Sequence, residues 1–172
     1  MSTAADDWPA RVFAALKTGG ISQVAYVPDA GHARLIELAR ADAAVRDIVL
    51  TTEEEGVALA AGAWLGGARA CLLLQSSGVG NCINMLTLMQ NGRFPLLMLV
   101  TMRGEEGEFN HWQVPMSQAT APALRLMDVD VARADTPEEA ADLVAASLAR
   151  AFGEERAAAV LFSQRLIGAK RW

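Results

Sequence analysis

Apolar residues recur along the chain with two spacings, one typical of helices and one typical of buried strands. Trp8, Val12 and Leu16 share one face of a predicted helix, which Asp7 can cap and which ends at Gly19. Short apolar runs then alternate with further helical repeats. The predicted strands cover residues 23–27, 48–51, 70–75, 94–101, 126–131 and 157–162. The later predicted helices cover residues 32–39, 53–65, 81–90 and 137–152.

Strands that alternate with helices at this spacing predict an α/β fold. Right-handed crossovers make successive strands parallel and place helices on both faces of the sheet. We therefore expect three layers, α/β/α, with a central, mostly parallel sheet of about six strands, in one domain spanning residues 1–172. Ligands bind beyond the carboxyl ends of such strands, so the loops near Pro28, Thr52, Ser76 and Arg103 should line one edge.

Composition narrows the classes of function. With 52% hydrophobic and 20% charged residues, the 172-residue chain has a globular composition. Its net charge is −5, and its Lys and Arg residues are scattered along the sequence. Such a chain offers no basic face to a phosphate backbone, so we expect no nucleic-acid partner.

Three features bear on the cellular location. Cys71 and Cys82 each lie in an apolar segment, which indicates two core thiols rather than a disulfide or a metal site. Asp6 and Asp7 near the N-terminus argue against a signal peptide. The longest apolar run, residues 94–102, is too short to cross a bilayer as a helix. We expect a cytoplasmic protein with no membrane partner and no metal ligands of its own.

A glycine-containing segment, Ser77-Gly78-Val79-Gly80, follows a predicted strand and precedes a helix. Free backbone N–H groups in this setting can bind an anion, and the same residues can equally form a tight turn. Position 83 is Ile, so the dinucleotide fingerprint is incomplete, and the Gly-Lys-Ser/Thr of a phosphate-binding loop is absent. The segment alone leaves both interpretations open.

Three glutamates begin the predicted helix 53–65. Carboxylates are favoured at a helix N-terminus whatever the protein does, and Thr52 with Glu55 has the spacing of a capping box. Glu54 is different, because it shares a helical face with small or apolar residues that we expect to point inward. These residues are Ala58, Ala61 and Leu65. A carboxylate at the buried end of such a stripe needs a partner.

A polar segment, residues 103–115, follows the strand predicted at 94–101, and an aperiodic segment of this length is usually functional or mobile. Within it, His111 can act as an acid or base or can be a solvated loop residue. His32 begins the second predicted helix as a capping or surface residue. Asp29, just before it, either caps that helix or belongs to a site.

Taken together, the motifs resemble the pyrimidine-binding domain of thiamine diphosphate enzymes. They are Val27-Pro28-Asp29, Thr52-Glu53-Glu54-Glu55-Gly56-Val57 with Ala60-Ala61-Gly62-Ala63-Trp64, and Gln75-Ser76-Ser77-Gly78-Val79-Gly80-Asn81. Within that group, four further runs are most similar to sulfopyruvate decarboxylase α subunits and phosphonopyruvate decarboxylases. They are Leu74-Gln75-Ser76-Ser77-Gly78, Pro95-Leu96-Leu97-Met98, Arg103-Gly104 and Gln113-Val114-Pro115-Met116. The resemblance spans nearly the whole chain.

The resemblance implies specific roles. In this family a glutamate ten residues before the aromatic residue of its helix binds N1′ of the cofactor's aminopyrimidine, and counting back from Trp64 gives Glu54. The implied cofactor-binding residues are Pro28, Asp29, Glu54, Ser77, Gly78 and Val79. His111 and Gln113 are implied in catalysis and substrate binding, and Arg103 either pairs with the anionic tail of the substrate or anchors its loop. Two departures affect these assignments: Ser117 replaces the glycine of the subgroup motif, and three successive glutamates allow a register shifted by one.

The family's Gly-Asp-Gly motif with a following Asn-Asn, which holds Mg²⁺ and the diphosphate, does not occur in the chain. The resemblance therefore implies a β subunit that holds Mg²⁺ and shares thiamine diphosphate with this chain in a hetero-oligomer, α2β2 or larger. The implied reaction converts sulfopyruvate to sulfoacetaldehyde and CO2. Phosphonopyruvate or another 3-substituted pyruvate is the alternative substrate. The alternative from another class is a non-catalytic regulatory or structural module.

Overall fold

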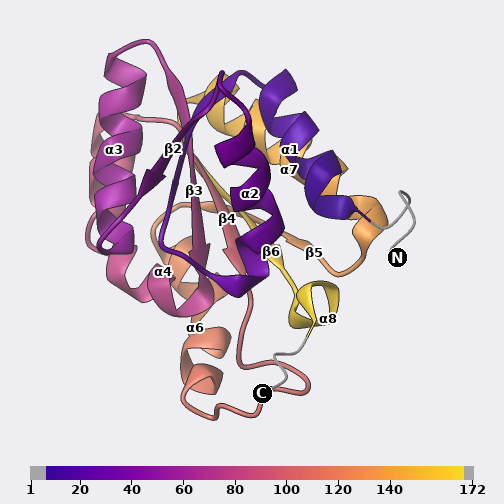
Figure 1. Ribbon diagram of the computed structural model, residues 1–172. Helices are drawn as coiled ribbons and strands as arrows, with labels where there is room; N and C mark the ends of the chain where they lie inside the picture. Colours follow the sequence, from indigo (N-terminus) through magenta and orange to yellow (C-terminus); the bar gives the residue numbers. More distant parts are fainter. Residues whose placement is uncertain (1–6, 169–172) are drawn as a thin grey trace.

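Six parallel strands form a single sheet at the centre of the molecule (Figure 1). The computed structural model describes residues 7–168. Residues 1–6 and 169–172 lie outside it, and so does Asp6, on which the expectation of no signal peptide partly rests. The strand order is β2-β1-β3-β4-β6-β5, and every neighbouring pair is parallel. The strands are β1 (Ile21–Tyr26), β2 (Arg46–Val49), β3 (Arg69–Gln75), β4 (Leu96–Thr101), β5 (Asp130–Ala134) and β6 (Ala157–Phe162). The predicted α/β fold is confirmed.

Helices cover both faces of this sheet. One face carries α1 (Trp8–Thr18), α2 (Ala33–Ala41) and α7 (Pro137–Glu154). The other face carries α3 (Glu53–Leu65), α4 (Ser76–Cys82), α5 (Leu86–Gly92) and α6 (Gln113–Leu126). Two short elements, the 3-10 turn η1 (Ala30–His32) and α8 (Gln164–Ile167), lie just beyond the ends of β1 and β6.

The central strands are buried on both faces, which explains their unbroken apolar sequences. In β3, Leu73 packs under α1, α2 and α7, whereas its neighbours Leu72 and Leu74 pack under the helices of the other face. Every residue of β4 is buried, as the continuous run at 94–101 predicts. Cys71 and Cys82 are buried free thiols in these two cores, so their predicted packing role is confirmed. The cytoplasmic location stays a prediction.

Several predicted boundaries are wrong, and the helix α6 was not predicted at all. The glycine-containing segment is the helix α4 itself, and the helix predicted at 81–90 is divided between α4 and α5 by a turn. The polar segment predicted to continue to residue 115 ends where α6 begins at Gln113. The strand predicted at 126–131 begins only at Asp130, because α6 continues to Leu126. Gly78 and Pro122 inside helices obscured these boundaries, since both residues lower helix propensity and tertiary packing overrides them here.

Strand order reverses between β1 and β3. The chain passes from β1 outward to β2, then returns across the sheet through α3 to β3 and continues in the opposite direction. Such a switch point opens a crevice at the carboxyl ends of the two strands, where ligands of open α/β sheets bind. Across residues 7–168 no helix is both long enough and apolar enough to span a membrane.

Candidate functional site

Hydrogen bonds connect the chain segments that leave the carboxyl ends of β1, β3 and β4. The Gln75 amide at the end of β3 donates to Oδ1 of Asp29, 3.0 Å away, in the segment that leaves β1. The Thr101 hydroxyl at the end of β4 donates to Oδ2 of the same carboxylate at 2.8 Å. The Ser77 hydroxyl, in the first turn of α4, donates to Oε1 of Gln75 at 2.9 Å. This network lies at the switch point between β1 and β3.

The β1 segment turns sharply after Pro28. Asp29 accepts a hydrogen bond from the backbone N–H of Gly31 at 3.0 Å and so caps η1. The predicted capping role is therefore present, and the same carboxylate also joins the network at the switch point. Pro28 is exposed beside it.

His32 is buried, so it is not a surface residue, and at the N-cap position of α2 its side chain makes no capping hydrogen bond. Its Nε2 atom lies 3.0 Å from the carbonyl oxygen of Leu99 and 3.3 Å from that of Leu74. Both oxygens are acceptors, so Nε2 carries the hydrogen, and Nδ1 has no hydrogen-bond partner. Burial, which disfavours the charged form, lowers the pKa of His32 despite the nearby Asp29 carboxylate. A neutral imidazole thus fastens the Asp29 turn to β3 and β4.

The predicted capping box at the start of α3 does not form. The Thr52 hydroxyl donates to the Glu54 carboxylate instead of accepting a backbone N–H, and Glu55 accepts the N–H of Thr51 at 2.8 Å. The hydrogen bond from Thr52 lowers the pKa of Glu54, with help from the backbone N–H of Glu54 itself.

The predicted inward stripe below Glu54 is also wrong. Ala58 and Leu65 are exposed, and only Ala61 of the predicted stripe lies on the buried side of α3. The buried positions are Gly56, Val57, Ala60, Ala61 and Ala63. The helix has small or apolar residues on almost every side, so its sequence does not distinguish the buried face.

Glu53 makes the closest contacts with α4. Its Oε2 atom accepts a hydrogen bond from the Asn81 side chain at 2.8 Å. Its carboxylate also fills the space next to Gly78, where a Cβ atom would come within 2.4 Å of Oε1. Burial raises the pKa of the Cys82 thiol to about 12, and the negative charges of Glu53 and Glu54 add to that shift. The sequence analysis named Glu54 and left open a register shifted by one, which would give Glu53.

A buried ion pair closes the segment that follows β4. The Arg103 guanidinium donates twice to the Glu108 carboxylate, at 2.8 and 2.9 Å, and neither side chain is more than 6% exposed. Burial opposes ionisation of Glu108, but N–H groups of Asn110, Gly104, Arg103 and Gln164 hold its pKa at about 2. The geometry therefore corresponds to the loop-anchoring alternative for Arg103.

His111 and Gln113 lie at the far end of this loop. His111 is exposed, and Gln113 is half-buried at the first position of α6. The loop that follows β4 begins close to its own end. Gly104, with φ +76°, lies against the backbone carbonyl of Gln113, where a Cβ atom would come within 2.3 Å of the oxygen. Within residues 7–168, no hydrogen bond connects either side chain to Asp29, Glu53 or Glu54. Hydrogen bonds thus join Asp29 and Glu53 to the end of β3 and to α4, and among the described residues none of them includes the side chain of His111 or Gln113.

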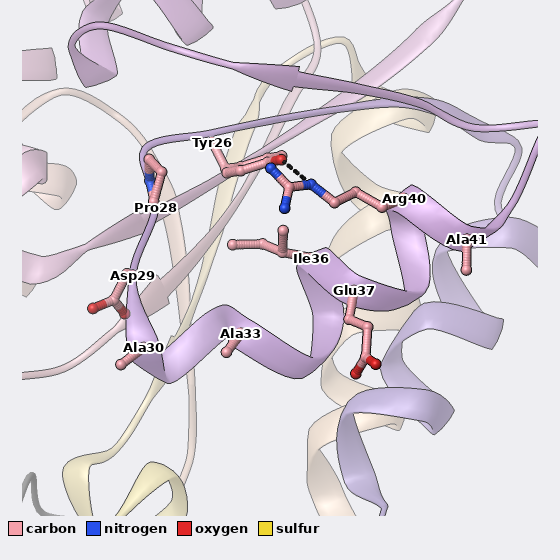
Figure 2. Close-up of a pocket in the computed structure, with 9 residues that line it drawn as sticks. All are labelled: Tyr26, Pro28, Asp29, Ala30, Ala33, Ile36, Glu37, Arg40 and Ala41. Carbon is pink, nitrogen blue, oxygen red and sulfur yellow. Dashed lines mark hydrogen bonds between the residues drawn. The ribbon is translucent and has the colours of Figure 1, made fainter.

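A separate groove of about 590 Å³ lies between α2 and the end of β1 (Figure 2). Arg40 extends across it and donates to the Tyr26 hydroxyl at 3.0 Å, and Asp47 accepts from both. Figure 2 shows the Asp29 carboxylate turned away from Arg40. The groove lining includes Pro28 and Asp29 but none of Glu54, Ser77, Gly78 or Val79.

Comparisons with known proteins give relatives that are decarboxylases of two named substrates. The chain is 37% identical over 134 residues to the sulfopyruvate decarboxylase subunit alpha of Methanothermobacter thermautotrophicus, covering 77% of this chain and 81% of that protein. It is 40% identical over 113 residues to the phosphonopyruvate decarboxylase of Streptomyces viridochromogenes, covering 64% of this chain and 28% of that protein. No model of a protein family matches the chain.

A solved structure has the same fold. It is 2-oxoglutarate:ferredoxin oxidoreductase from Magnetococcus marinus, with a TM-score of 0.72, 13% identity, and coverage of 93% of this chain and 29% of that one. This likeness shows the fold alone, whereas the relatives found by sequence are sulfopyruvate and phosphonopyruvate decarboxylases. The chain belongs to the family of sulfopyruvate decarboxylase α subunits, most of whose length it matches. The predicted resemblance is confirmed.

Proposed function

We propose that the chain is the α subunit of a thiamine diphosphate-dependent decarboxylase that converts sulfopyruvate to sulfoacetaldehyde and CO2. The observation that carries the proposal is the 37% identity to a sulfopyruvate decarboxylase α subunit over most of both chains. The carboxylates gathered at the switch point of the sheet support it. Phosphonopyruvate is the second candidate substrate, because a phosphonopyruvate decarboxylase is 40% identical over a shorter stretch.

The charges at the switch point fit one end of the cofactor and not the other. Asp29, Glu53 and Glu54 are all carboxylates, which can accept a hydrogen bond from a protonated pyrimidine nitrogen but repel a diphosphate. Bound thiamine diphosphate supplies the electron sink for decarboxylation. Arg103 does not offset the carboxylates, since Glu108 neutralises it. We therefore assign the diphosphate and Mg²⁺ to a β subunit.

Two neighbouring carboxylates compete for the role at the pyrimidine N1′ atom. The count from Trp64 indicates Glu54, whereas contacts with Gly78 and Asn81 support Glu53. Gly78 and Val79 belong to the proposed cofactor-binding segment, so the carboxylate that packs against α4 is the better placed of the two. We assign the role to Glu53 and keep Glu54 as the alternative. In this role the carboxylate would hold a proton on N1′. The amide of a glutamine at the same position could not exchange that proton.

The remaining proposed residues form two groups. Pro28, Asp29, Ser77, Gly78 and Val79 line the cofactor, and His111 and Gln113 contact the anionic 2-oxoacid. Arg103 acts by fixing the loop that carries His111, through its buried pair with Glu108. His111 and Gln113 reach the reacting atoms only in the complex with the β subunit, whose surface closes the site.

The test is reconstitution. The chain is co-expressed with its cognate β subunit and purified as a complex, with size-exclusion chromatography and light scattering to establish an α2β2 or larger assembly. CO2 release is then measured with sulfopyruvate, phosphonopyruvate and pyruvate in the presence of thiamine diphosphate and Mg²⁺. We expect the highest kcat/KM with sulfopyruvate and none with the α chain alone. A complex that assembles but turns over none of these acids would identify a non-catalytic module instead.

A further inference from the structure

Both oxygens of the Asp29 carboxylate have hydrogen-bond donors from other parts of the chain. Oδ1 accepts from the Gln75 amide at 3.0 Å. Oδ2 accepts from the Thr101 hydroxyl at 2.8 Å and from the N–H of Gly31 at 3.0 Å. Gln75 ends β3 and Thr101 ends β4, so the two central strands hold a side chain that follows β1.

The fit around this carboxylate is tight. Thr101 is fully buried, and its methyl group packs against Gly31 so closely that a Cβ atom there would lie 2.8 Å from Cγ2. The same atom would lie 2.9 Å from Oδ2 of Asp29. His32, one residue further on, binds the Leu99 carbonyl oxygen. The turn at residues 29–32 is therefore held in two places, by the contacts of the Asp29 side chain and by the hydrogen bond from His32 to β4.

The donors to Asp29 are neutral. An amide, a hydroxyl and a backbone N–H orient a carboxylate without cancelling its charge, and no Lys or Arg of residues 7–168 forms an ion pair with it. Glu108 contrasts with it, because Arg103 compensates that carboxylate fully. Asp29 is thus an oriented negative charge at the switch point of the sheet, and oriented charges contribute to catalysis because they need no reorganisation during the reaction.

We propose that Thr101 and Gln75 are positioning residues that hold the Asp29 carboxylate in one orientation for the decarboxylation. The inference rests on the proposed function, in which Asp29 lies beside the cofactor and the substrate. We expect neither residue to touch substrate. Thr101 acts through Asp29, whereas Gln75 acts through Asp29 and also accepts a hydrogen bond from the Ser77 hydroxyl, so Thr101 gives the cleaner test. Their hydroxyl and amide groups matter, whereas the volumes of their side chains do not.

Matched variants separate the hydroxyl from its volume. Thr101→Val keeps the shape and removes the donor, Thr101→Ser keeps the donor and removes the methyl group, and Gln75→Met removes the amide at similar length. In the complex with the β subunit, we expect T101V and Q75M to lower kcat about tenfold with KM for sulfopyruvate changed less than about threefold. T101S should restore most of that loss.

A second readout needs no turnover. Hydrogen exchange of the Gly31 amide, followed by NMR on the α chain alone, reports whether Oδ2 of Asp29 still holds that N–H. We expect faster exchange in T101V than in wild type, and slower exchange in T101S than in T101V. Thermal denaturation of each variant shows whether the fold is intact.

The outcomes distinguish the two claims. Wild-type kcat and wild-type Gly31 exchange in T101V overturn the positioning role. Equal losses of kcat in T101V and T101S overturn it as well, since packing and not the hydroxyl would then explain both. If the wild-type complex turns over no 2-oxoacid, the proposed function fails. In that case Gly31 exchange still decides whether Thr101 holds Asp29, and unchanged exchange in T101V overturns that too.

Discussion

The carboxylate of Glu53 occupies the space that a side chain at Gly78 would need. A Cβ atom at position 78 would lie 2.4 Å from Oε1 of Glu53 and 2.5 Å from its carboxyl carbon. The first turns of α3 and α4 therefore meet through a glycine on one side and a carboxylate on the other. This contact, together with the hydrogen bond from Asn81, fixes the acidic start of α3 beside the proposed cofactor-binding segment.

Gly78→Ala tests that contact. The atoms in the way belong to the end of a flexible side chain, and alanine favours a helix, so we expect the free energy of unfolding to change by less than about 1 kcal/mol. Turnover of the complex should fall at least about tenfold, because the Glu53 carboxylate must move. Gly80→Ala is the matched control, since its Cβ atom would meet only Met116 Sδ, at 3.4 Å. Wild-type turnover in G78A would contradict the claim that the contact between Gly78 and Glu53 positions the carboxylate for turnover.

The Arg103–Glu108 pair predicts an acid-sensitive loop. The pKa of Glu108 is about 2 in the folded chain, against an ordinary value of 4.5. Its contribution to stability is therefore complete above about pH 4.5 and is lost as the pH falls toward 2. Glu108→Gln should lower the free energy of unfolding by about 3 kcal/mol at pH 7, as expected when one partner of a buried pair is removed.

Urea denaturation at pH 7 and at pH 3 measures this effect. The difference between wild type and E108Q should shrink at pH 3, where the unfolded wild-type chain gains a proton at this position. Glu106→Gln is the control in the same loop. Glu106 is 88% exposed, and its ion pair with Arg165 is long, at 3.8 Å, so its loss should change stability little. A difference that is equal at both pH values would contradict the assignment of the low pKa to Glu108.

His32 should remain neutral at mildly acidic pH. Burial lowers its pKa below the ordinary value of 6.5, so an unfolded chain gains a proton before the folded chain does, and stability falls as the pH drops below about 6.5. ¹⁵N NMR of the α chain at pH 6 should show a neutral His32 ring with its hydrogen on Nε2. His111→Ala assigns the signals, because the chain has only two histidines. A protonated His32 at pH 6 would show that the ring is not sealed from water.

The sequence predicts the fold well because burial dictates its strongest signals. The run at β4 is apolar throughout, since helices cover both of its faces. The helix boundaries around Gly78 and Pro122 are less predictable, because close packing permits residues that intrinsic propensity disfavours. The burial of His32 was not predicted, for a related reason. Its partners are the backbone carbonyls of Leu74 and Leu99, which no side-chain pattern reveals.

In the candidate site, too, some residues could be predicted from the sequence and others only from the fold. Asp29 and the start of α3 were predicted from motifs, and the fold places them at the expected edge. Gln75 and Thr101 were not identified as partners of Asp29, because 46 and 72 residues separate them from it in the sequence. The choice between Glu53 and Glu54 depends on the rotation of α3, and a helix with small residues on most sides leaves that rotation undetermined.

The central claim is that the chain contributes an activating carboxylate from the first turn of α3 to a sulfopyruvate decarboxylase. Glu53→Gln and Glu54→Gln, each co-purified with the β subunit, test it through the rate of CO2 release from sulfopyruvate. We expect both variants to assemble, E53Q to lose at least about a hundredfold in kcat, and E54Q to keep most of the wild-type kcat. A loss confined to E54Q would return the role to Glu54, and near-normal rates in both variants would contradict the claim.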